Sequence, residues 1–276
     1  MMSRNQDKLL QVLNTCAFSC LAVAVLIIAT TPSNGGYEIS LYSVFPPVFW
    51  ILLLVPMILP ILIVYLNMDL QPRKYALILF ASISSLLLLL SMPAFRGYVA
   101  YGEGDVLTHI GIIKEILYFN HIDPSNPYPI IHIYVSILSQ IVALPPELLS
   151  SYMPQLFSLL LIVSIWILAK SLDYSYIQTF CITSLAILPI IGVWLTIDYI
   201  MPSTIGYMFF PLLFYLILKK RKSQIYTILF LIIYLLLMYL HPESALYLII
   251  GLAAIMISFA IIDGFRIDKN NLSILL

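Results

Sequence analysis

Charged residues are scarce in this chain. Lysine and arginine contribute 13 residues, aspartate and glutamate another 13, and together they make up 9% of the 276 residues. A soluble domain usually carries about 25% charged residues, so this chain has too few charges to cover a water-facing surface. The composition therefore excludes a soluble enzyme and a disordered chain, and the zero net charge gives no basis for binding nucleic acid.

Cysteine is also scarce. The three cysteines, Cys16, Cys20 and Cys181, all lie within apolar runs. So few cysteines exclude a secreted disulfide scaffold, and these positions favour packing as small apolar side chains.

Apolar residues, in contrast, make up 62% of the chain and occur in long continuous runs. A spanning helix needs about 20 such residues, whereas barrel strands would alternate with a period of two. The sequence therefore predicts an all-α polytopic transmembrane helical bundle formed by one domain, residues 1–276. The predicted spans are residues 9–29, 44–66, 75–94, 155–170, 177–197, 200–218, 224–240 and 242–262. The first is predicted to be an uncleaved anchor, because no small-residue cleavage site follows it.

One further apolar run, residues 130–144, is too short for a full span. Its 15 residues would make a helix of about 22 Å, whereas the hydrocarbon core is about 30 Å thick. Pro145 and Pro146 follow and would stop a helix. We therefore predict a half-membrane or strongly tilted segment that places His132 near the outer face.

The basic clusters predict the topology. Arg4 and Lys8 place the N-terminus in the cytoplasm by the positive-inside rule, and residues 219–222, a run of Lys and Arg, should lie on the same side. Both hold only if 130–144 dips into the membrane and returns, unless a neighbouring span has been misjudged.

The predicted organisation is three N-terminal spans (1–94), an outer loop (95–129), a half-span with five further spans (130–262) and a cytoplasmic end (263–276). The apolar residues at the end of that segment suggest that the chain continues. The membrane is a cell membrane or one of the endoplasmic-reticulum type.

The outer loop contains an amphipathic pattern. Apolar residues at spacings of three and four predict a helix lying on the membrane surface: Val106, Ile110, Ile113 and Leu117. A second side of this helix groups three polar residues: Asp105, Thr108 and His109. The neighbouring glycines, Gly102 and Gly104, would let backbone approach a ligand closely.

The predicted topology gathers seven ionisable residues at the outer face: Glu103, Asp105, His109, His132, Asp198, His241 and Glu243. Ionisable groups near the membrane are costly and point to a functional site. Each also has a structural interpretation. Asp105, Asp198, His241 and Glu243 could cap helices or mark helix ends, Glu103 could be a solvated loop charge, and His109 and His132 could be hydrogen-bonded structural histidines.

Two short motifs resemble the multi-spanning glycosyltransferases of the C superfamily, which include protein mannosyltransferases and aminoarabinose transferases. The motifs are Gly104-Asp105-x-x-x-His109 and Tyr128-Pro129-x-x-His132, and the resemblance covers roughly 95–262. This chain departs from the family in two ways. The acidic loop follows the third predicted span rather than the first, and members of the family usually continue beyond this length.

The resemblance implies transfer of a sugar from a polyprenyl (dolichyl) phosphate carrier to a protein, lipid or glycan acceptor at the outer membrane face. In such enzymes the loop aspartate, here Asp105, acts as the base or holds a divalent metal such as Mg²⁺ or Mn²⁺, with His109 as a second candidate ligand. Arg96 and Lys114 would offset the donor phosphate, or contact lipid headgroups. The remaining outer-face residues would bind substrate. Two other classes stay open: a multi-spanning transporter, and a non-catalytic membrane assembly subunit.

Overall fold

The computed structural model describes residues 4–33, 35, 38, 40–66, 72–98, 105–196, 200–219 and 222–262. These residues form helices and connections and contain no strand. Within them, five helical segments are long and apolar enough to cross a membrane: Asp7–Thr30, Pro47–Tyr65, Tyr75–Phe95, Pro146–Ser171 and Pro202–Lys219. The prediction of an all-helical chain is confirmed, and the five segments indicate a multi-pass membrane protein.

The helices, in chain order, are α1 (Arg4–Thr30), α2 (Leu41–Val44), α3 (Pro47–Tyr65), α4 (Pro72–Phe95), α5 (Val106–Phe119), α6 (Pro129–Val142), α7 (Pro146–Ser150), α8 (Met153–Ser171), α9 (Tyr176–Leu185), α10 (Ile187–Thr196), α11 (Pro202–Met208), α12 (Phe210–Lys219), α13 (Gln224–Leu240) and α14 (Pro242–Ile262).

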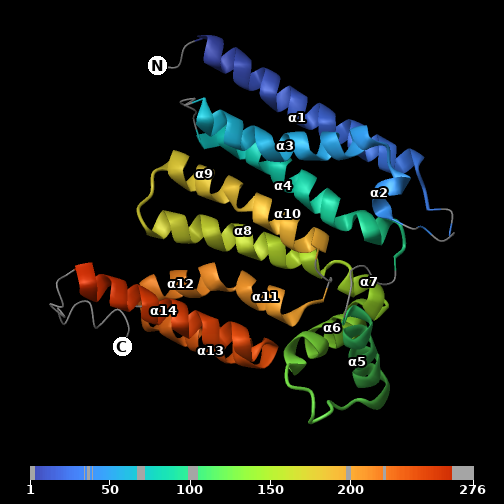
Figure 1. The fold of residues 1–276 in the computed structure, drawn as a ribbon, viewed down its shortest axis with the longest axis vertical. Helices are drawn as coiled ribbons and strands as arrows, with labels where there is room; N and C mark the ends of the chain where they lie inside the picture. The colour runs from blue at the N-terminus through green and yellow to red at the C-terminus, as the bar shows by residue number, and fades with distance from the viewer. Residues whose placement is uncertain are drawn as a thin grey trace.

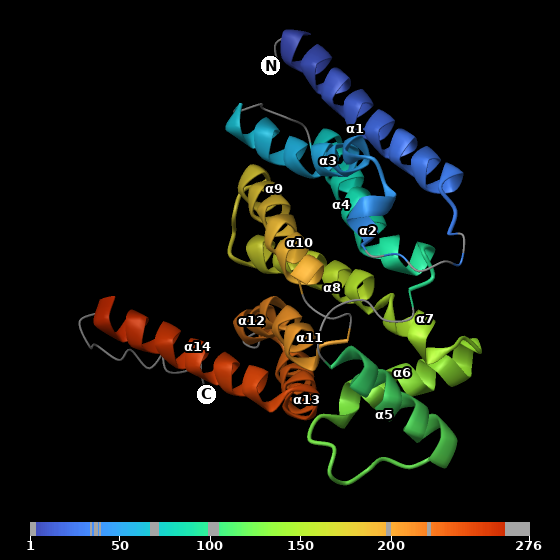
Figure 2. The same ribbon diagram turned by 45° about the vertical axis from the view of Figure 1, so that its right-hand side comes forward.

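Most of the helices lie side by side in an elongated stack, in which α9 and α10 lie between α4 and α8 although they follow α8 in the chain. Figure 1 shows α1 at one end of the stack and α13 and α14 at the other, with α3, α4 and α8–α12 between them. Helix α1 packs against α3 and α4, and α8 packs against α9 and α12. The short helices α5, α6 and α7 lie together at one end of the long helices, as the turned view in Figure 2 also shows. The placement of residues 130–144 as a half-membrane segment stays a prediction.

Two of the predicted spans are interrupted, and proline explains both interruptions. The predicted span 177–197 divides into α9 and α10, because Pro189 has no N–H to donate to the carbonyl of Leu185. The predicted span 200–218 divides into α11 and α12, because Pro211 cannot donate to the carbonyl of Tyr207. The sequence analysis treated both as continuous helices, although each contains an interior proline.

Helix α6 matches the predicted short segment. Its 14 residues correspond to about 21 Å of helix, too short for a bilayer core of about 30 Å. The helix ends at Ala143, which has a left-handed backbone (φ 54°). Pro146 then begins α7, so the two prolines stop the first helix and start the next.

The topology can be tested by single-cysteine labelling in a variant that lacks the three native cysteines. Ser125 lies in the exposed connection between α5 and α6, and Ser223 is the exposed N-cap of α13. We expect an impermeant maleimide added outside intact cells to label Ser125→Cys and not Ser223→Cys. Labelling of both positions, or of position 223 alone, would contradict the predicted orientation.

Candidate functional site

Helices α5 and α6 form a hairpin whose apolar faces pack against each other. Val106, Ile110 and Ile113 of α5 are buried, and so are Ile131 and Val135 of α6. The α5 stripe predicted to rest on the membrane surface is therefore covered by protein. The sequence analysis missed this because α6 offers a matching buried face, which the pattern of α5 alone does not reveal.

The hairpin brings two of the predicted site histidines into direct contact. His109 Nδ1 lies 2.8 Å from His132 Nε2, and the ring centroids are 5.1 Å apart. His132 is fully buried and His109 is 6% exposed. Because the residues are 23 positions apart, this contact depends on the turn that reverses the chain between α5 and α6.

The turn itself supplies a third member of the cluster. Asn126 Nδ2 lies 3.0 Å from His132 Nδ1, and Asn126 Oδ1 accepts a hydrogen bond from the Tyr128 backbone N–H at 3.2 Å. Pro127 and Pro129 flank Tyr128 and favour an extended backbone before each proline. Asn126 was not among the residues selected from the sequence.

Burial keeps both histidines neutral. Both lie outside the five candidate spans, and burial lowers the pKa of His109, although the nearby Asp105 carboxylate opposes that shift. Burial, together with the neighbouring His109, lowers the pKa of His132 to about 4. A buried imidazolium without a counter-ion would be costly, so at neutral pH the pair exchanges a hydrogen bond without carrying charge.

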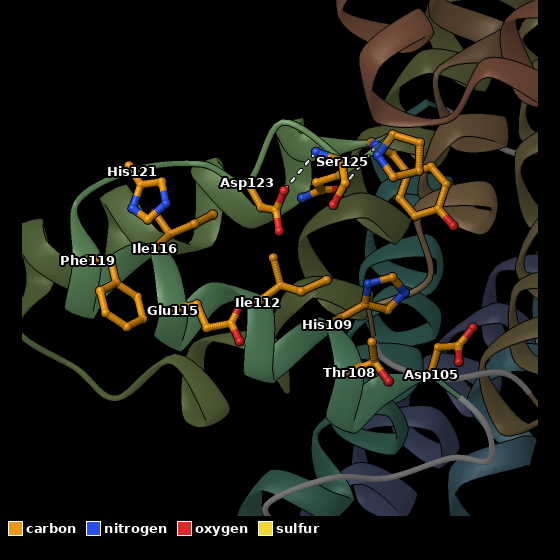
Figure 3. A pocket seen from close by; sticks show the side chains of 13 residues that line it. Asp105, Thr108, His109, Ile112, Glu115, Ile116, Phe119, His121, Asp123 and Ser125 are labelled. Atoms are coloured by element: carbon orange, nitrogen blue, oxygen red, sulfur yellow. Dashed lines mark hydrogen bonds between the residues drawn. The ribbon is translucent and has the colours of Figure 1, made fainter.

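His109 lines a polar pocket of about 480 Å³. Figure 3 shows α5 on one side of this pocket and the connection to α6 on the other, with Asp105, Thr108 and His109 at one end and Glu115 and Phe119 at the other. The predicted grouping of Asp105, Thr108 and His109 is confirmed. The lining also includes Tyr128, from the second sequence motif, and residues that were not selected from the sequence: Ile112, Glu115, Ile116, Phe119, His121, Asp123, Ser125, Asn126 and Pro127.

Asp105 is exposed at the N-terminus of α5. It occupies the N-cap position, but its side chain makes no capping hydrogen bond. No hydrogen bond therefore supports the interpretation of Asp105 as a capping side chain. Its carboxylate borders the pocket.

His241 approaches the hairpin from the junction of α13 and α14. Its Nδ1 accepts a hydrogen bond from the Ser244 backbone N–H at 3.2 Å, so it caps α14. The Tyr128 ring lies between two histidines, with centroids 6.0 Å from His241 and 6.4 Å from His109. Glu243 is exposed, and its Oε2 lies 3.9 Å from His241 Nε2.

The two cations predicted to offset a donor phosphate are each paired with a carboxylate. Arg96 is 7% exposed and forms an ion pair with Glu38, with Nε 3.2 Å from Oε2. Its guanidinium also donates to the Thr31 carbonyl and lies 5.7 Å above the Phe45 ring. Lys114 forms a more exposed ion pair with Glu147 of α7. Both cations thus hold neighbouring segments together.

The other predicted site residues, Glu103 and Asp198, lie outside the described residues. Asp105 and His109, the candidate metal ligands, both line the pocket. Within the described ranges, no group of three or more His, Cys, Asp or Glu side chains is arranged to hold a metal ion.

A second, apolar groove of about 360 Å³ lies beside α6. Its walls come from α6, α8, the α11–α12 junction and α13, and its lining is Ile130, Ile131, Tyr134, Leu156, Phe157, Leu160, Phe209, Ile233, Leu236, Leu237 and Leu240. Tyr128, the N-cap of α6, lines the polar pocket, and Ile130, in the first turn of α6, lines the groove, so the two hollows are bordered by residues two positions apart.

Comparison with known proteins adds no relative. The chain matches no protein-family model, no curated protein and no solved structure.

Proposed function

We propose that this protein is a membrane glycosyltransferase that moves a sugar from a polyprenyl-phosphate carrier to an acceptor hydroxyl. The observation that carries the proposal is that a polar pocket and an apolar groove are lined by residues only two positions apart, Tyr128 and Ile130, at the start of α6. A lipid-linked sugar has the same two parts, a polar head and an apolar chain. The two motifs that resemble C-superfamily enzymes supply residues to this same region, Asp105 and His109 from one and Tyr128 from the other.

In the proposed reaction, Asp105 accepts the proton of the acceptor hydroxyl. The acceptor oxygen forms a bond to the anomeric carbon, and the bond from that carbon to the phosphate oxygen breaks. The polyprenyl phosphate leaves with the electron pair. An exposed carboxylate at the pocket border is suited to this role, because a general base must lie within hydrogen-bond reach of the proton that it takes.

The apolar groove predicts how donor use depends on chain length. Leu156 of α8 lines the groove and is 43% exposed, so Leu156→Trp should fill it without disturbing the core. We expect a rise of about tenfold or more in KM for a long-chain polyprenyl-phosphate sugar, and little change for a short-chain analogue that does not reach the groove. Transfer by the purified protein in lipid nanodiscs measures both values.

Leu159→Trp is the matched control, because Leu159 lies on the same helix, is similarly exposed and does not line the groove. Equal effects of the two substitutions would contradict a role of the groove in donor binding. If the unaltered chain transfers no sugar from any polyprenyl-phosphate donor, the glycosyltransferase proposal fails. The transporter and assembly-subunit interpretations then take precedence.

A further inference from the structure

Asn126 fixes the direction of the hydrogen bonds in the histidine cluster. Its Oδ1 accepts the Tyr128 N–H, which sets the orientation of the amide and turns Nδ2 toward His132 Nδ1. An amide –NH₂ group only donates, so His132 Nδ1 must accept. This assignment follows from the hydrogen-bond network, as tautomers generally do.

The same logic continues to His109. A neutral imidazole carries one N–H, so His132 carries its proton on Nε2 and donates it to His109 Nδ1 across 2.8 Å. His109 must then carry its own proton on Nε2. A doubly protonated His132 would set an N–H against the Asn126 amide N–H, and burial already lowers the pKa of His132 to about 4.

The pocket that His109 lines is otherwise rich in acceptors. Among the described residues, His132 is the only hydrogen-bond partner of the His109 ring. Three carboxylates line the pocket, from Asp105, Glu115 and Asp123, and no lysine or arginine is among its described lining residues. The network therefore leaves Nε2–H as the one ring donor of His109 without a partner among the described residues, and His109 lines a pocket bordered by three carboxylates.

We propose that this pocket binds the uncharged, hydroxyl-bearing part of a substrate, a sugar or a glycan acceptor, through a hydrogen bond from His109 Nε2–H to a ligand oxygen. The inference rests on the proposed function and specifies its substrate part. Sugar hydroxyls can donate to the carboxylates and accept from His109, and the exposed Phe119 ring offers an apolar face to sugar C–H groups. A phosphate would face three carboxylates, with no lysine or arginine among the described lining residues to offset its charge. Asn126 and His132 are positioning residues.

The tautomers can be measured directly. The chain has four histidines, so a ¹⁵N-histidine spectrum of the full chain in nanodiscs is simple enough to assign by substitution. We expect His109 and His132 both to be neutral, with the proton on Nε2. A proton on Nδ1 of His109, or a charged His109, at neutral pH would overturn the inference. This result does not depend on whether the protein transfers sugar.

The ligand class is tested with three probes: a panel of methyl glycosides, inorganic phosphate and Mg²⁺. We expect at least one methyl glycoside to shift the His109 Nε2 resonance, and neither phosphate nor Mg²⁺ to do so. Failure of all glycosides, or a shift caused by phosphate or Mg²⁺ alone, would overturn the assignment. Because binding requires no turnover, this result is independent of the transfer assay.

Asn126→Asp tests the positioning role. At alkaline pH the new carboxylate should accept from His132 Nδ1–H, which reverses both tautomers and leaves His109 Nε2 as an acceptor. We expect glycoside affinity to fall about tenfold, the scale of one lost hydrogen bond. Asn120→Asp makes the same substitution at the start of the same connection, where Asn120 is exposed and neither lines the pocket nor contacts His132, so it should leave both tautomers and the affinity unchanged. Reversed tautomers with unchanged affinity, or an equal loss in Asn120→Asp, would overturn the role.

Discussion

Asp105→Asn is expected to lower sugar transfer by about 100-fold to 10,000-fold, the range typical of a lost acid–base group. The substitution removes the negative charge and keeps the shape of the side chain. The Asp105 carboxylate makes no capping hydrogen bond, and Asn is as favourable as Asp at an N-cap, so the fold should be unaffected. Single-turnover transfer from a polyprenyl-phosphate sugar, with the thermal unfolding midpoint measured in parallel, gives both quantities.

Asp173→Asn provides the matched control. Asp173 is exposed, lies away from the pocket at the connection between α8 and α9, and has a left-handed backbone (φ 59°) that Asn tolerates well. It should retain full transfer. If Asp105→Asn keeps most of the transfer activity, Asp105 is not the base and the assigned chemistry is wrong.

Arg96→Leu is expected to destabilise the protein by about 3–5 kcal/mol, the usual cost of leaving one partner of a buried ion pair alone. The substitution would strand Glu38, whose side chain is 10% exposed and which otherwise accepts hydrogen bonds from Arg96 and Tyr98. It would also remove the donor to the Thr31 carbonyl at the end of α1. Unfolding in a denaturant series, for the protein in mixed micelles, measures the loss.

The Lys114–Glu147 pair serves as the comparison, because the Lys114 side chain is 56% exposed. Lys114→Leu should cost only about 0–1 kcal/mol, as exposed ion pairs do. Replacing both partners, Arg96→Leu with Glu38→Leu, should recover part of the loss, because no buried charge then remains unpaired. Similar losses for Arg96→Leu and Lys114→Leu would contradict the interpretation that burial makes the Arg96–Glu38 ion pair important for stability.

The stability contributed by the Arg96–Glu38 ion pair also depends on pH. The Arg96 guanidinium lowers the pKa of Glu38, so the pair stabilises the fold fully above the ordinary glutamate pKa. That contribution is lost as the pH falls through the lowered pKa of the folded protein. Acidification should therefore reduce the stability difference between the unaltered protein and Arg96→Leu, and a constant difference would contradict the linkage.

Local patterns predicted more of the helices than of the contacts between them. The three N-terminal spans and the stop at Pro145–Pro146 follow from run length and proline chemistry, which are properties of neighbouring residues. The His109–His132 bond joins residues 23 positions apart, and the Arg96–Glu38 pair joins residues 58 positions apart. Such pairings depend on how the helices pack, and neither the spacing of residues nor the composition of the chain predicts that packing.

The candidate site shows the same contrast between local patterns, which were predicted, and contacts between distant residues, which were not. Asp105, His109 and His132 were selected from the sequence motifs and from the cost of placing ionisable groups near the membrane. The role of Asn126 was missed, because an amide in a proline-rich turn has no distinctive pattern until its partner is known. The cations Arg96 and Lys114 were predicted without their carboxylate partners, since either could equally well have faced lipid headgroups.

The position of the groove in the chain has a consequence for biogenesis. The polar pocket is made from residues 105–128, whereas one wall of the apolar groove comes from Ile233, Leu236, Leu237 and Leu240 of α13. Chains generally acquire structure from the N-terminus during synthesis. A nascent chain that ends after α12 can therefore already contain the histidine pair and the polar pocket. The groove stays open on one side until α13 inserts, so lipid could enter it laterally before the site is complete.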